Sequence, residues 1–538
     1  MHCGKHLSFK ATVSRAATPV VATPLFGCCR LQRPCSTEFY GCRSHSSYPK
    51  LPSFSPRDLQ QTILPTVSHI TRATKDDDAI ASQLASADEV YTPVVCPDFS
   101  KKKIYPDIEN KFFNRKKEYD MITGHLNRKP SKPLLLLGPI NSGKSALLRW
   151  IVEQEKSRVV YLNCGIESVF TPELMAQQLR KRARMLFSQM GIKSIKIFVK
   201  TLKPAPNLVG LLAKAMDTAS PTGELLNACE SEFFPEDTSK DLTAVINTYN
   251  LILVNTTFWK KEPIIVIDEF NVLRQWKAKG NDALQNLLEF LKRICKEKKR
   301  AHIVLASSDF FMVSWLRQKG FDGTQRKVQV VGDLTSAEAF VYVCGGKVLN
   351  RKGFKEEWPG LMAQSKATKE LGMIPEDWKK VWSVCGGNMY LLRNCVADAT
   401  QYNSWDKGVA ETLSEPQEDV TTALDFPETI PPPTDSTGPR IWGTEHYKAV
   451  LRLIAANPYH AVRRKEVLAA LRDIGIAENV TAADVLLSMV EFNVVSLRPY
   501  SIMAQDIPRE AFFYEEWGVE EKDSVVTMRS PAHPCCSF

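Results

Sequence analysis

The sequence predicts an α/β fold in which helices cover both faces of a parallel β-sheet to give a three-layer core, followed by a helical segment and a small C-terminal domain. Three observations support this prediction. Short apolar runs alternate with helical segments, which is typical of a buried parallel sheet. A glycine-rich loop joins the first of these runs to a helix, and near the C-terminus three helical segments precede a short strand. The 538 residues are too many for one core, so two to four domains are expected.

The strands of the sheet are predicted from short apolar runs, with helices expected between them. The clearest helix start is at Thr171, which can cap the helix, while Pro172 suits its first position. Residues 191–238 are interpreted as an irregular insertion, partly broken by prolines. The expected strands are residues 134–137, 158–163, 263–269, 302–308 and 328–331, and the expected helices are residues 146–156, 172–190, 241–259 and 281–298.

A phosphate-binding loop follows the first predicted strand. Residues 138–145 fit G-x-x-x-x-G-K-[ST], and the strand before the loop and the helix after it are the context that this motif requires. Backbone N–H groups of such a loop and the helix N-terminus point at phosphate oxygens. Lys144 can reach the β- and γ-phosphates, and the Ser145 hydroxyl can bind Mg²⁺. The predicted nucleotide-binding residues are Gly138, Pro139, Ile140, Asn141, Ser142, Gly143, Lys144, Ser145 and Ala146.

Two adjacent acids, Asp268 and Glu269, end the third predicted strand. A nucleotide hydrolase needs acids opposite its phosphate loop: Asp268 would hold Mg²⁺, and Glu269 would orient and deprotonate the attacking water. Ser307 and Ser308 end the next strand, where either hydroxyl could contact the γ-phosphate or the water, or simply belong to a turn. We predict Lys144, Glu269 and Ser308 as catalytic residues.

The loop, the I-D-E strand and the Ser-Ser strand together resemble the AAA+ ATPases, and most closely the archaeal-type ATPases allied to the STAND signalling ATPases. Three further segments support the resemblance. Residues 113–118 are similar to the F-x-x-R-x-x-E box that precedes the core in that group, and residues 333–339 resemble the segment that opens its helical lid. Residues 385–390 resemble the G-G-N-P element of the lid, with Met389 in place of the usual proline. The resemblance covers about residues 110–503.

The resemblance implies a P-loop ATPase that binds ATP and Mg²⁺ and changes shape between domains or between neighbouring subunits of a homo-oligomer. Such enzymes often use an arginine from an adjacent subunit. Arg326, just before the last strand, matches the family position best, and Arg317 is second. A solvated surface arginine is the alternative interpretation of both. Arg393 is a candidate lid sensor.

The chain after the core is divided by composition and pattern. The core is predicted at residues 109–333 and the helical lid at residues 334–412. Residues 413–440 are interpreted as an extended linker, because residues 413–439 carry six acids and no Lys or Arg. Three helices and a strand suited to a β-wing indicate a winged-helix-like domain at residues 441–508. Residues 509–538 are predicted to be a tail.

Residues 1–57 hold eight Lys/Arg and one acid, a net charge of +7. Residues 1–37 contain no acid and are rich in small and hydroxyl residues, which is typical of an organelle transit peptide. Pro19, Pro24 and Pro34 favour a plastid over a mitochondrial destination, and a disordered tail on a cytosolic protein is the alternative. Residues 58–108 are interpreted as a disordered linker.

Composition restricts the remaining functions. Without residues 1–57, only +3 of the net charge of +10 remains, so the folded part gives no strong signal for nucleic acid. The sequence has no window of eighteen apolar residues, so no membrane span is predicted. The cysteines lack zinc-type CxxC spacing, and buried thiols are expected at Cys164, Cys344, Cys385 and Cys395.

Two functions remain open. The first is an ATP-hydrolysing switch that acts on an unknown protein partner through the winged helix. The second is a DNA-binding ATPase related to replication initiators. We favour the switch, because the basic residues of the C-terminal domain form only a modest patch and phosphate binding would demand more positive charge. A small-molecule kinase is disfavoured by the Asp-Glu pair. The basic residues are Arg463, Arg464, Lys465 and Arg498.

Overall fold

A computed structural model describes most of the chain between residues 96 and 536, and these residues belong to one compact unit, residues 81–538. The predicted transit segment at residues 1–57 lies outside the described residues, as does most of the predicted linker. The described ranges are 96–99, 103–108, 111–189, 195, 223–234, 240–254, 261–276, 281–433, 436, 438–476, 478–516 and 519–536.

The five predicted strands form one parallel sheet in the order β2-β3-β4-β1-β5. Leu137 pairs with Ser307, and Asn163 pairs with Asp268. The carboxyl ends of β1, β3 and β4 therefore lie at one edge of the sheet, and this edge carries the phosphate loop, the acidic pair and the serine pair. Ligand sites of open parallel sheets lie at this edge. The strands are β1 (Leu134–Leu137), β2 (Val159–Asn163), β3 (Ile264–Asp268), β4 (His302–Ser307) and β5 (Lys327–Val330).

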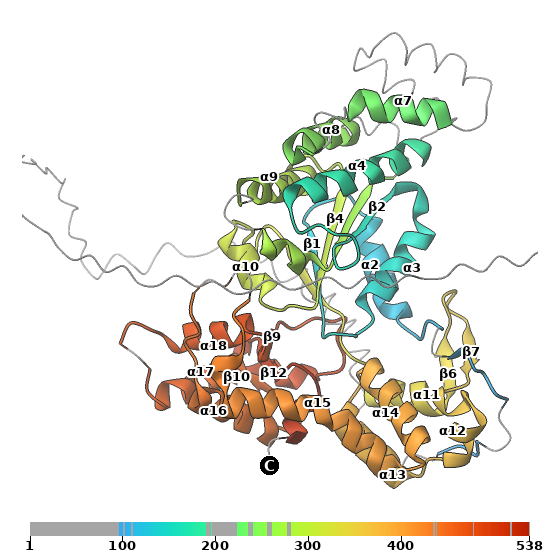
Figure 1. The fold of residues 1–538 in the computed structure, drawn as a ribbon, viewed down its shortest axis with the longest axis vertical. Coiled ribbons are helices and arrows are strands. Elements are labelled where there is room, and N and C mark those ends of the chain that lie inside the picture. The colour runs from blue at the N-terminus through green and yellow to red at the C-terminus, as the bar shows by residue number, and fades with distance from the viewer. Residues whose placement is uncertain are drawn as a thin grey trace, which may run out of the picture. The chain divides into compact units, whose positions relative to one another are not determined.

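Helices lie on both sides of the sheet (Figure 1). Alternate strand residues face opposite helical layers. Leu134 and Leu136 pack with helices α2 and α3 in one core cluster. Leu135 and Leu137 pack with α4, α8, α9 and α10 in another. The four leucines of β1 therefore pack alternately against the helices on the two faces of the sheet. The helices are α2 (Lys116–Leu126), α3 (Lys144–Gln154), α4 (Pro172–Gln189), α8 (Leu242–Val254), α9 (Asn281–Lys292, continued by a π-helical turn at Arg293–Glu297) and α10 (Met312–Gln318).

The start of α4 confirms the predicted cap, since the Thr171 Oγ1 accepts a hydrogen bond from the Leu174 N–H at 3.3 Å. The prediction of an irregular insertion at residues 191–238 is wrong in part, because helix α7 (Gly223–Phe233) lies within it. Its Leu225 and Cys229 are fully buried against the main core, and this packing stabilises a helix that local sequence signals did not reveal.

The end of the predicted linker at residues 58–108 is not disordered. Phe99 and Ile108 are buried in the core of the lid, and the Tyr105 N–H donates to the Ala363 carbonyl at 2.9 Å. These residues therefore form a strap across the lid immediately before the core begins.

The lid opens with helix α11, whose N-terminus carries a capping box between Thr335 and Glu338. It is not all-helical as predicted, because β6 and β7 form an antiparallel hairpin. The Asn350 side chain accepts hydrogen bonds from two N–H groups of the loop, and Gly353 has a φ of 82°. These features stabilise the turn at residues 350–354, where the chain reverses direction. The elements are α11 (Ser336–Cys344), β6 (Gly346–Leu349), β7 (Lys355–Trp358), a 3₁₀ turn (Leu361–Ala363), α12 (Lys366–Leu371), α13 (Pro375–Cys385) and α14 (Met389–Tyr402).

Helix α15 (Trp405–Asp425) contradicts the predicted linker at residues 413–440 over its first half. Thr412, Pro416, Val420 and Ala423 recur at helical spacing and are buried, while the acids lie mostly on the exposed face. The charge run is therefore one side of an amphipathic helix. A 3₁₀ turn at Pro427–Thr429 ends the helical region.

A winged-helix topology follows, in which three helices pack on a three-stranded antiparallel sheet of order β8-β12-β9. The predicted boundary at residue 508 is wrong, because the predicted tail at residues 509–538 supplies the central strand β12. A hairpin of β10 and β11 forms the wing. The elements are α16 (Thr444–Ala456), β8 (Ala461–Arg463), α17 (Arg464–Asp473), α18 (Ala482–Glu491), β9 (Val495–Arg498), β10 (Phe513–Glu516), β11 (Val519–Lys522) and β12 (Val525–Met528).

A chain that ends at residue 508 is expected to lose the folded winged helix. The truncation removes Val525, Val526 and Met528, which are buried. Their burial contributes on the order of 2 kcal/mol each, and the strand's ladder to both neighbours is lost as well. Thermal unfolding of the full chain and of chains ending at 508 and 530 measures the effect. The chain ending at 530 keeps β12 and serves as the control; equal stability of all three chains would contradict the topology.

The four cysteines that the sequence analysis expects to be buried are buried. Among the described residues, we find no helix with both the length and the apolar character needed to span a bilayer.

Candidate active site

The phosphate loop lies between β1 and α3 as predicted, and its backbone explains the residues of the motif. Asn141 and Gly143 have φ values of 63° and 88°, in the left-handed region that asparagine and glycine tolerate best. A side chain at Gly138 would collide with the carbonyl oxygen of Val331. The loop can therefore follow its tight path only with these small or permissive residues.

Lys144 begins α3 and is buried within the loop. Its Nζ donates to the carbonyl oxygens of Gly138 at 2.9 Å and Pro139 at 2.7 Å. Burial lowers the pKa of Lys144 to about 8, against the opposing effect of nearby carboxylates, first among them Glu269. Phosphate oxygens would be stronger partners than these neutral carbonyls, because the hydrogen bonds would be charge-assisted on both sides.

Asp268 is fully buried at the end of β3. Its Oδ2 accepts a hydrogen bond from the Tyr161 hydroxyl at 2.9 Å and lies 3.5 Å from the Asn163 Nδ2, while its Oδ1 accepts from the Glu269 N–H at 3.1 Å. Tyr161 and Asn163 lie on β2, the neighbouring strand. They orient the carboxylate, a role that the sequence analysis missed.

Glu269 leaves the strand with a left-handed backbone, φ 52°, and lines the cavity described below. Burial, and then the nearby Asp268, raise its pKa, while Lys144 acts in the opposite sense. A carboxylate with a raised pKa is a better proton acceptor near neutral pH. Its position and its pKa therefore both suit a general base.

The two serines after β4 have different environments. The Ser307 hydroxyl is buried, lies 2.9 Å from the Asn271 Oδ1 and accepts a hydrogen bond from the Asp309 N–H at 3.0 Å, so it stabilises the turn. Ser308 lines the same cavity as Glu269. The structure thus separates two residues that the sequence left as alternatives.

Arg115 is a positioning residue that the prediction did not include. Its Nη2 donates to the carbonyl oxygens of Ser142 and Gly332, each at 2.8 Å, and its Nη1 forms a 2.7 Å ion pair with Glu118. It therefore ties the phosphate loop to the segment that follows β5. The available signal was the N-terminal box, in which Arg115 and Glu118 are three residues apart.

The lid meets the phosphate loop through its G-G-N element. The Asn388 side chain caps α14 and donates through Nδ2 to the Ile140 carbonyl at 3.1 Å. The Leu334 N–H donates to the Gly387 carbonyl at 2.9 Å, so this glycine joins the lid to the end of the core. Met389, in place of the usual proline, lines the cavity together with Tyr390 and the sensor candidate Arg393.

Arg326 does not fit the predicted role of an arginine supplied to a neighbouring subunit. It is buried, and its guanidinium donates to the carbonyl oxygens of Phe321 and of Val313, the latter at 2.8 Å. Burial lowers its pKa to about 10. The prediction is wrong because Arg326 binds the first turn of α10 and the loop after that helix, and a finger residue has to be exposed.

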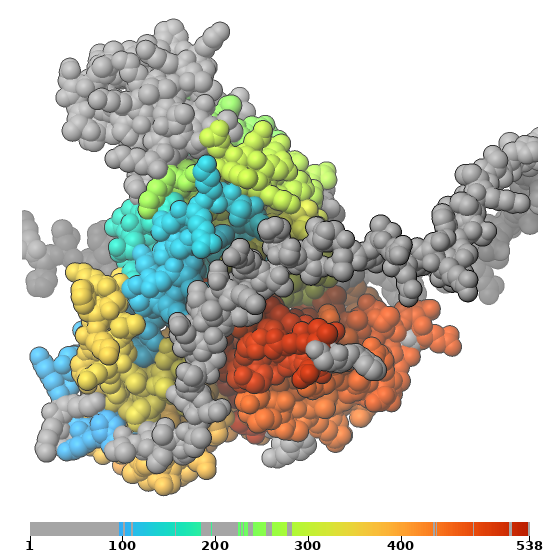
Figure 2. Space-filling view, turned by 180° about the vertical axis from the view of Figure 1, so that it is seen from behind, coloured from blue at the N-terminus to red at the C-terminus, as the bar shows by residue number. Residues whose placement is uncertain are grey.

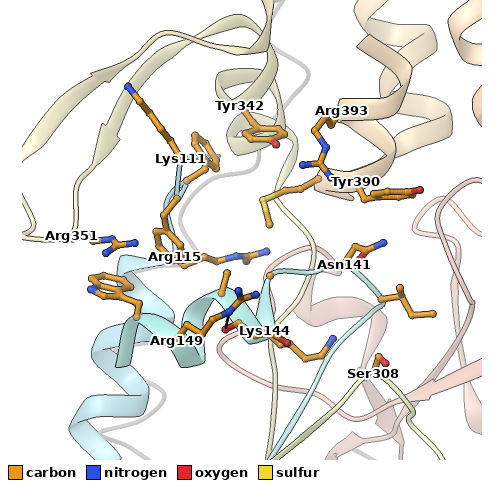
Figure 3. A pocket seen from close by; sticks show the side chains of 18 of the residues that line it. Lys111, Arg115, Asn141, Lys144, Arg149, Ser308, Tyr342, Arg351, Tyr390 and Arg393 are labelled. Atoms are coloured by element: carbon orange, nitrogen blue, oxygen red, sulfur yellow. Dashed lines mark hydrogen bonds between the residues drawn. The ribbon is translucent and has the colours of Figure 1, made fainter. Parts of the chain in front are cut away.

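A cavity of about 680 Å³ collects the site residues between the loop, α3, the N-terminal box and the lid. Figure 3 shows the cationic side chains that line it, which come from several elements. Its six cations outnumber its two acids, so it suits a multiply charged anion. The cations are Lys111, Arg115, Lys144, Arg149, Arg351 and Arg393, and the acids are Glu153 and Glu269. No sequence pattern indicated Lys111 or Arg351.

The residues at the phosphate end fit a magnesium ion. Ser145 lines the cavity, and Asp268 lies at the end of β3 with its carboxylate held by neighbours. Hydroxyl and carboxylate oxygens, with water, are the ligands that Mg²⁺ prefers.

Comparisons with known proteins give similarities for this part of the chain. Residues 112–341 match the model of an ATPase domain found predominantly in Archaea. Two uncharacterised ATP-binding proteins of Methanocaldococcus jannaschii are 26% identical over 254 residues and 24% identical over 315 residues. The first alignment covers 46% of this chain and 63% of that relative, and the second covers 56% and 74%.

Solved structures give weaker similarities. A Walker-type ATPase of Pyrococcus abyssi has 14% identity and a TM-score of 0.42, with 82% of this chain and 99% of that chain covered. The ORC2 protein of Aeropyrum pernix, solved in ADPNP-ADP complexes, has 12% identity and a TM-score of 0.37, with 80% and 95% covered.

Proposed function

We propose that this chain, whose residues 112–341 form an ATPase domain of the archaeal type, is a Mg²⁺-dependent molecular switch that binds and hydrolyses ATP and conveys its nucleotide state to a protein partner through the winged helix. The observation that carries the proposal is the cavity that brings Lys144, Glu269 and the lid together. The winged helix also contacts the segments that bear these residues.

The chemistry follows from the positions of the side chains. Lys144 would bind the β- and γ-phosphates, and Glu269 would accept the proton of the attacking water. Ser308 lies where it could hold the γ-phosphate or that water. Ser145 and Asp268 would hold Mg²⁺, which when bound neutralises charge on the phosphates.

A first contact connects the winged helix to the catalytic strands. Arg274, five residues after Glu269, forms a 2.7 Å ion pair with Asp309 and a 3.5 Å ion pair with Glu491 of α18. Asp309 directly follows Ser308. Because Arg274 and Glu491 are both buried, a shift at the strand ends would act directly on α18.

A second contact connects the winged helix to the phosphate loop. Arg498 pairs with both carboxylate oxygens of Asp506, at 2.8 and 2.9 Å. A side chain at Gly332 would collide with that carboxylate, so Asp506 lies against the end of the core. Asp333 directly follows Gly332, and its Oδ1 lies 3.3 Å from the Asn388 Nδ2. The same Nδ2 donates to the Ile140 carbonyl of the phosphate loop. These contacts form a continuous path from the loop to the winged helix.

The charges of the winged helix favour a protein partner over DNA. Helix α18, which occupies the position of a recognition helix, contains Asp484 and Glu491 and no Lys or Arg. The basic residues of the predicted patch are largely paired: Arg463 with Glu466 at 2.6 Å, Arg464 with Asp523 at 3.4 Å, and Arg498 as described. The strands of the wing hairpin carry Glu515, Glu516, Glu520 and Glu521. Phosphate binding requires free positive charge.

Fluorescence anisotropy with duplex DNA, using the chain without residues 1–57, tests this choice. At physiological salt we expect no binding tighter than the non-specific range of about 10⁻⁴ to 10⁻⁶ M. A parallel affinity capture uses a Glu269→Gln variant loaded with ATP or with ADP, and the proposal expects a protein retained only with ATP. Nanomolar, sequence-selective DNA binding would instead favour a DNA-binding ATPase.

A further inference from the structure

The tip of the β6–β7 hairpin reaches from the lid to helix α3. Arg351 forms a 3.1 Å ion pair with Glu153. Its guanidinium also lies 5.0 Å from the ring centre of Phe112 and 5.6 Å from that of Trp150. In Figure 2 the surface of the hairpin adjoins that of the first helices of the core. All four residues line the 680 Å³ cavity.

This contact lies at the end of the cavity remote from the phosphate loop. Trp150 and Glu153 follow Lys144 by six and nine residues on one helix, which places them about 9 and 13 Å along its axis. A nucleotide whose phosphates bind Lys144 would therefore direct its nucleoside towards the Arg351 end. Figure 3 shows Arg351 and Lys144 at separate places around the cavity.

The platform beneath Arg351 is rigid. Trp150 is buried, stacks on Tyr119 at 3.9 Å and meets Phe112 edge-on at 5.1 Å. The hairpin loop is held by Asn350, whose Oδ1 accepts the N–H groups of Lys352 and Phe354 at 3.0 Å each. Arg351 is thus a cation on an ordered loop that faces an ordered aromatic surface, and such stacking depends on a planar guanidinium.

We propose that Arg351 is a nucleotide-retaining residue: by bridging the lid hairpin and α3 it closes the nucleoside end of the cavity and slows the release of bound nucleotide. The inference rests on the proposed binding of ATP in this cavity and adds to it a residue that governs residence time. Arg351 does not act on the reacting phosphates, so it is a positioning residue.

The geometry sets the size and the character of the effect. Arg351 and Glu153 are both about half exposed, with side-chain exposures of 47% and 52%, so their attraction is screened by salt. Arg351→Ala is expected to speed nucleotide release about three- to tenfold. Glu153→Ala is expected to do the same, and the double variant should release no faster than the faster single variant. Arg351→Lys keeps the charge but loses the planar stacking, so it should fall between parent and alanine.

Stopped-flow release of a fluorescent N-methylanthraniloyl ATP, chased with excess ATP, measures these rates on the chain without residues 1–57. Lys352→Ala, at the exposed neighbouring position of the same loop, is the matched control and should leave release unchanged. Raising the salt concentration should speed release from the parent and have less effect on Arg351→Ala. The salt dependence of release from the parent is measured without any variant, so this part of the test does not depend on whether a variant folds.

The outcomes separate the two proposals. A parent that fails to bind the analogue overturns the proposed function. If the parent binds the analogue, and Arg351→Ala and Glu153→Ala release it at the parental rate and with the parental salt dependence, the retaining role alone is overturned. Faster release with an unchanged single-turnover hydrolysis rate supports the inference, since a residue of the chemical step would change that rate.

Discussion

Glu269→Gln is expected to slow ATP hydrolysis at least about a hundredfold while ATP binding stays close to that of the parent. General-base catalysis contributes roughly 10² to 10⁴, and the amide keeps the shape of the side chain but cannot accept the water's proton. The carboxylate lines the cavity with Lys144 and Ser308, so the substitution changes one atom and one charge at the reacting end. Single-turnover hydrolysis and calorimetric ATP binding separate the two effects.

The pH dependence gives an independent check of the same residue. Burial and Asp268 raise the pKa of Glu269, so the base is lost by protonation as the pH falls through that raised value. The parental rate should therefore drop towards acid pH, and Glu269→Gln should lack this drop. Glu297→Gln, an exposed position away from the site, is the control. A parental single-turnover rate in Glu269→Gln would transfer the role to another acid.

The parts of the site that are encoded locally were predictable from the sequence. Gly143 of the phosphate loop is needed for a local reason, its positive φ, and the strand before the loop is uniformly apolar because both faces of a parallel sheet are covered. The motif also includes Gly138, although the group that excludes a side chain there, the Val331 carbonyl, is distant in sequence. Asp268 and Glu269 follow a strand whose apolar run is equally clear. Ser308 could be named but not distinguished from Ser307, because which hydroxyl faces the cavity depends on the turn and on Asn271.

The parts that depend on long-range contacts were not predictable in this way. Arg115 binds the carbonyl of Gly332, 217 positions later in the chain, and no pattern near residue 115 indicates that partner. The strand β12 was assigned to a tail because a four-residue run becomes a strand only when β8 and β9 pair with it. Arg326 was assigned from its place before a strand, whereas its burial results from packing against the first turn of α10 and the loop after it.

Amino-acid composition led to a wrong prediction for a helix that has both charged, exposed residues and buried ones. The acidic stretch after residue 412 was interpreted as a solvated linker, yet Val420 and Ala423 of α15 are buried. A helix with acids on its exposed face has the same composition as an extended acidic linker, and only the spacing of its few apolar residues separates the two. The hairpin that carries Arg351 was missed for a related reason, since its short strands contain charged residues and no continuous apolar run.

Lys144→Ala is expected to weaken ATP binding by more than about a hundredfold. Each hydrogen bond to a charged group contributes about 1.5–3 kcal/mol, and the ammonium would make such bonds to both the β- and γ-phosphates in place of the carbonyls of Gly138 and Pro139. Calorimetric titration with ATP and Mg²⁺ measures the loss, with melting temperatures of both proteins as the folding control. An affinity equal to that of the parent would contradict the assignment of the phosphate loop.

The sign of the pH effect distinguishes a bound cation from a merely structural lysine. Burial lowers the pKa of Lys144 from 10.5 to about 8, so the free protein loses this charge as the pH rises above 8. Phosphates stabilise the ammonium, and ATP affinity of the parent should therefore fall from about pH 8 upwards. Between pH 8 and 10.5 the unfolded chain binds more protons at this residue than the folded protein does, so Lys144 makes the ligand-free protein more stable as the pH rises through that window. Lys144→Ala removes both dependences, because alanine has no proton to lose. ATP titrations and thermal unfolding at pH 7.5 and 9.5 test them together. A parental affinity that stays constant over this range would show that the Lys144 charge does not contribute to ATP binding.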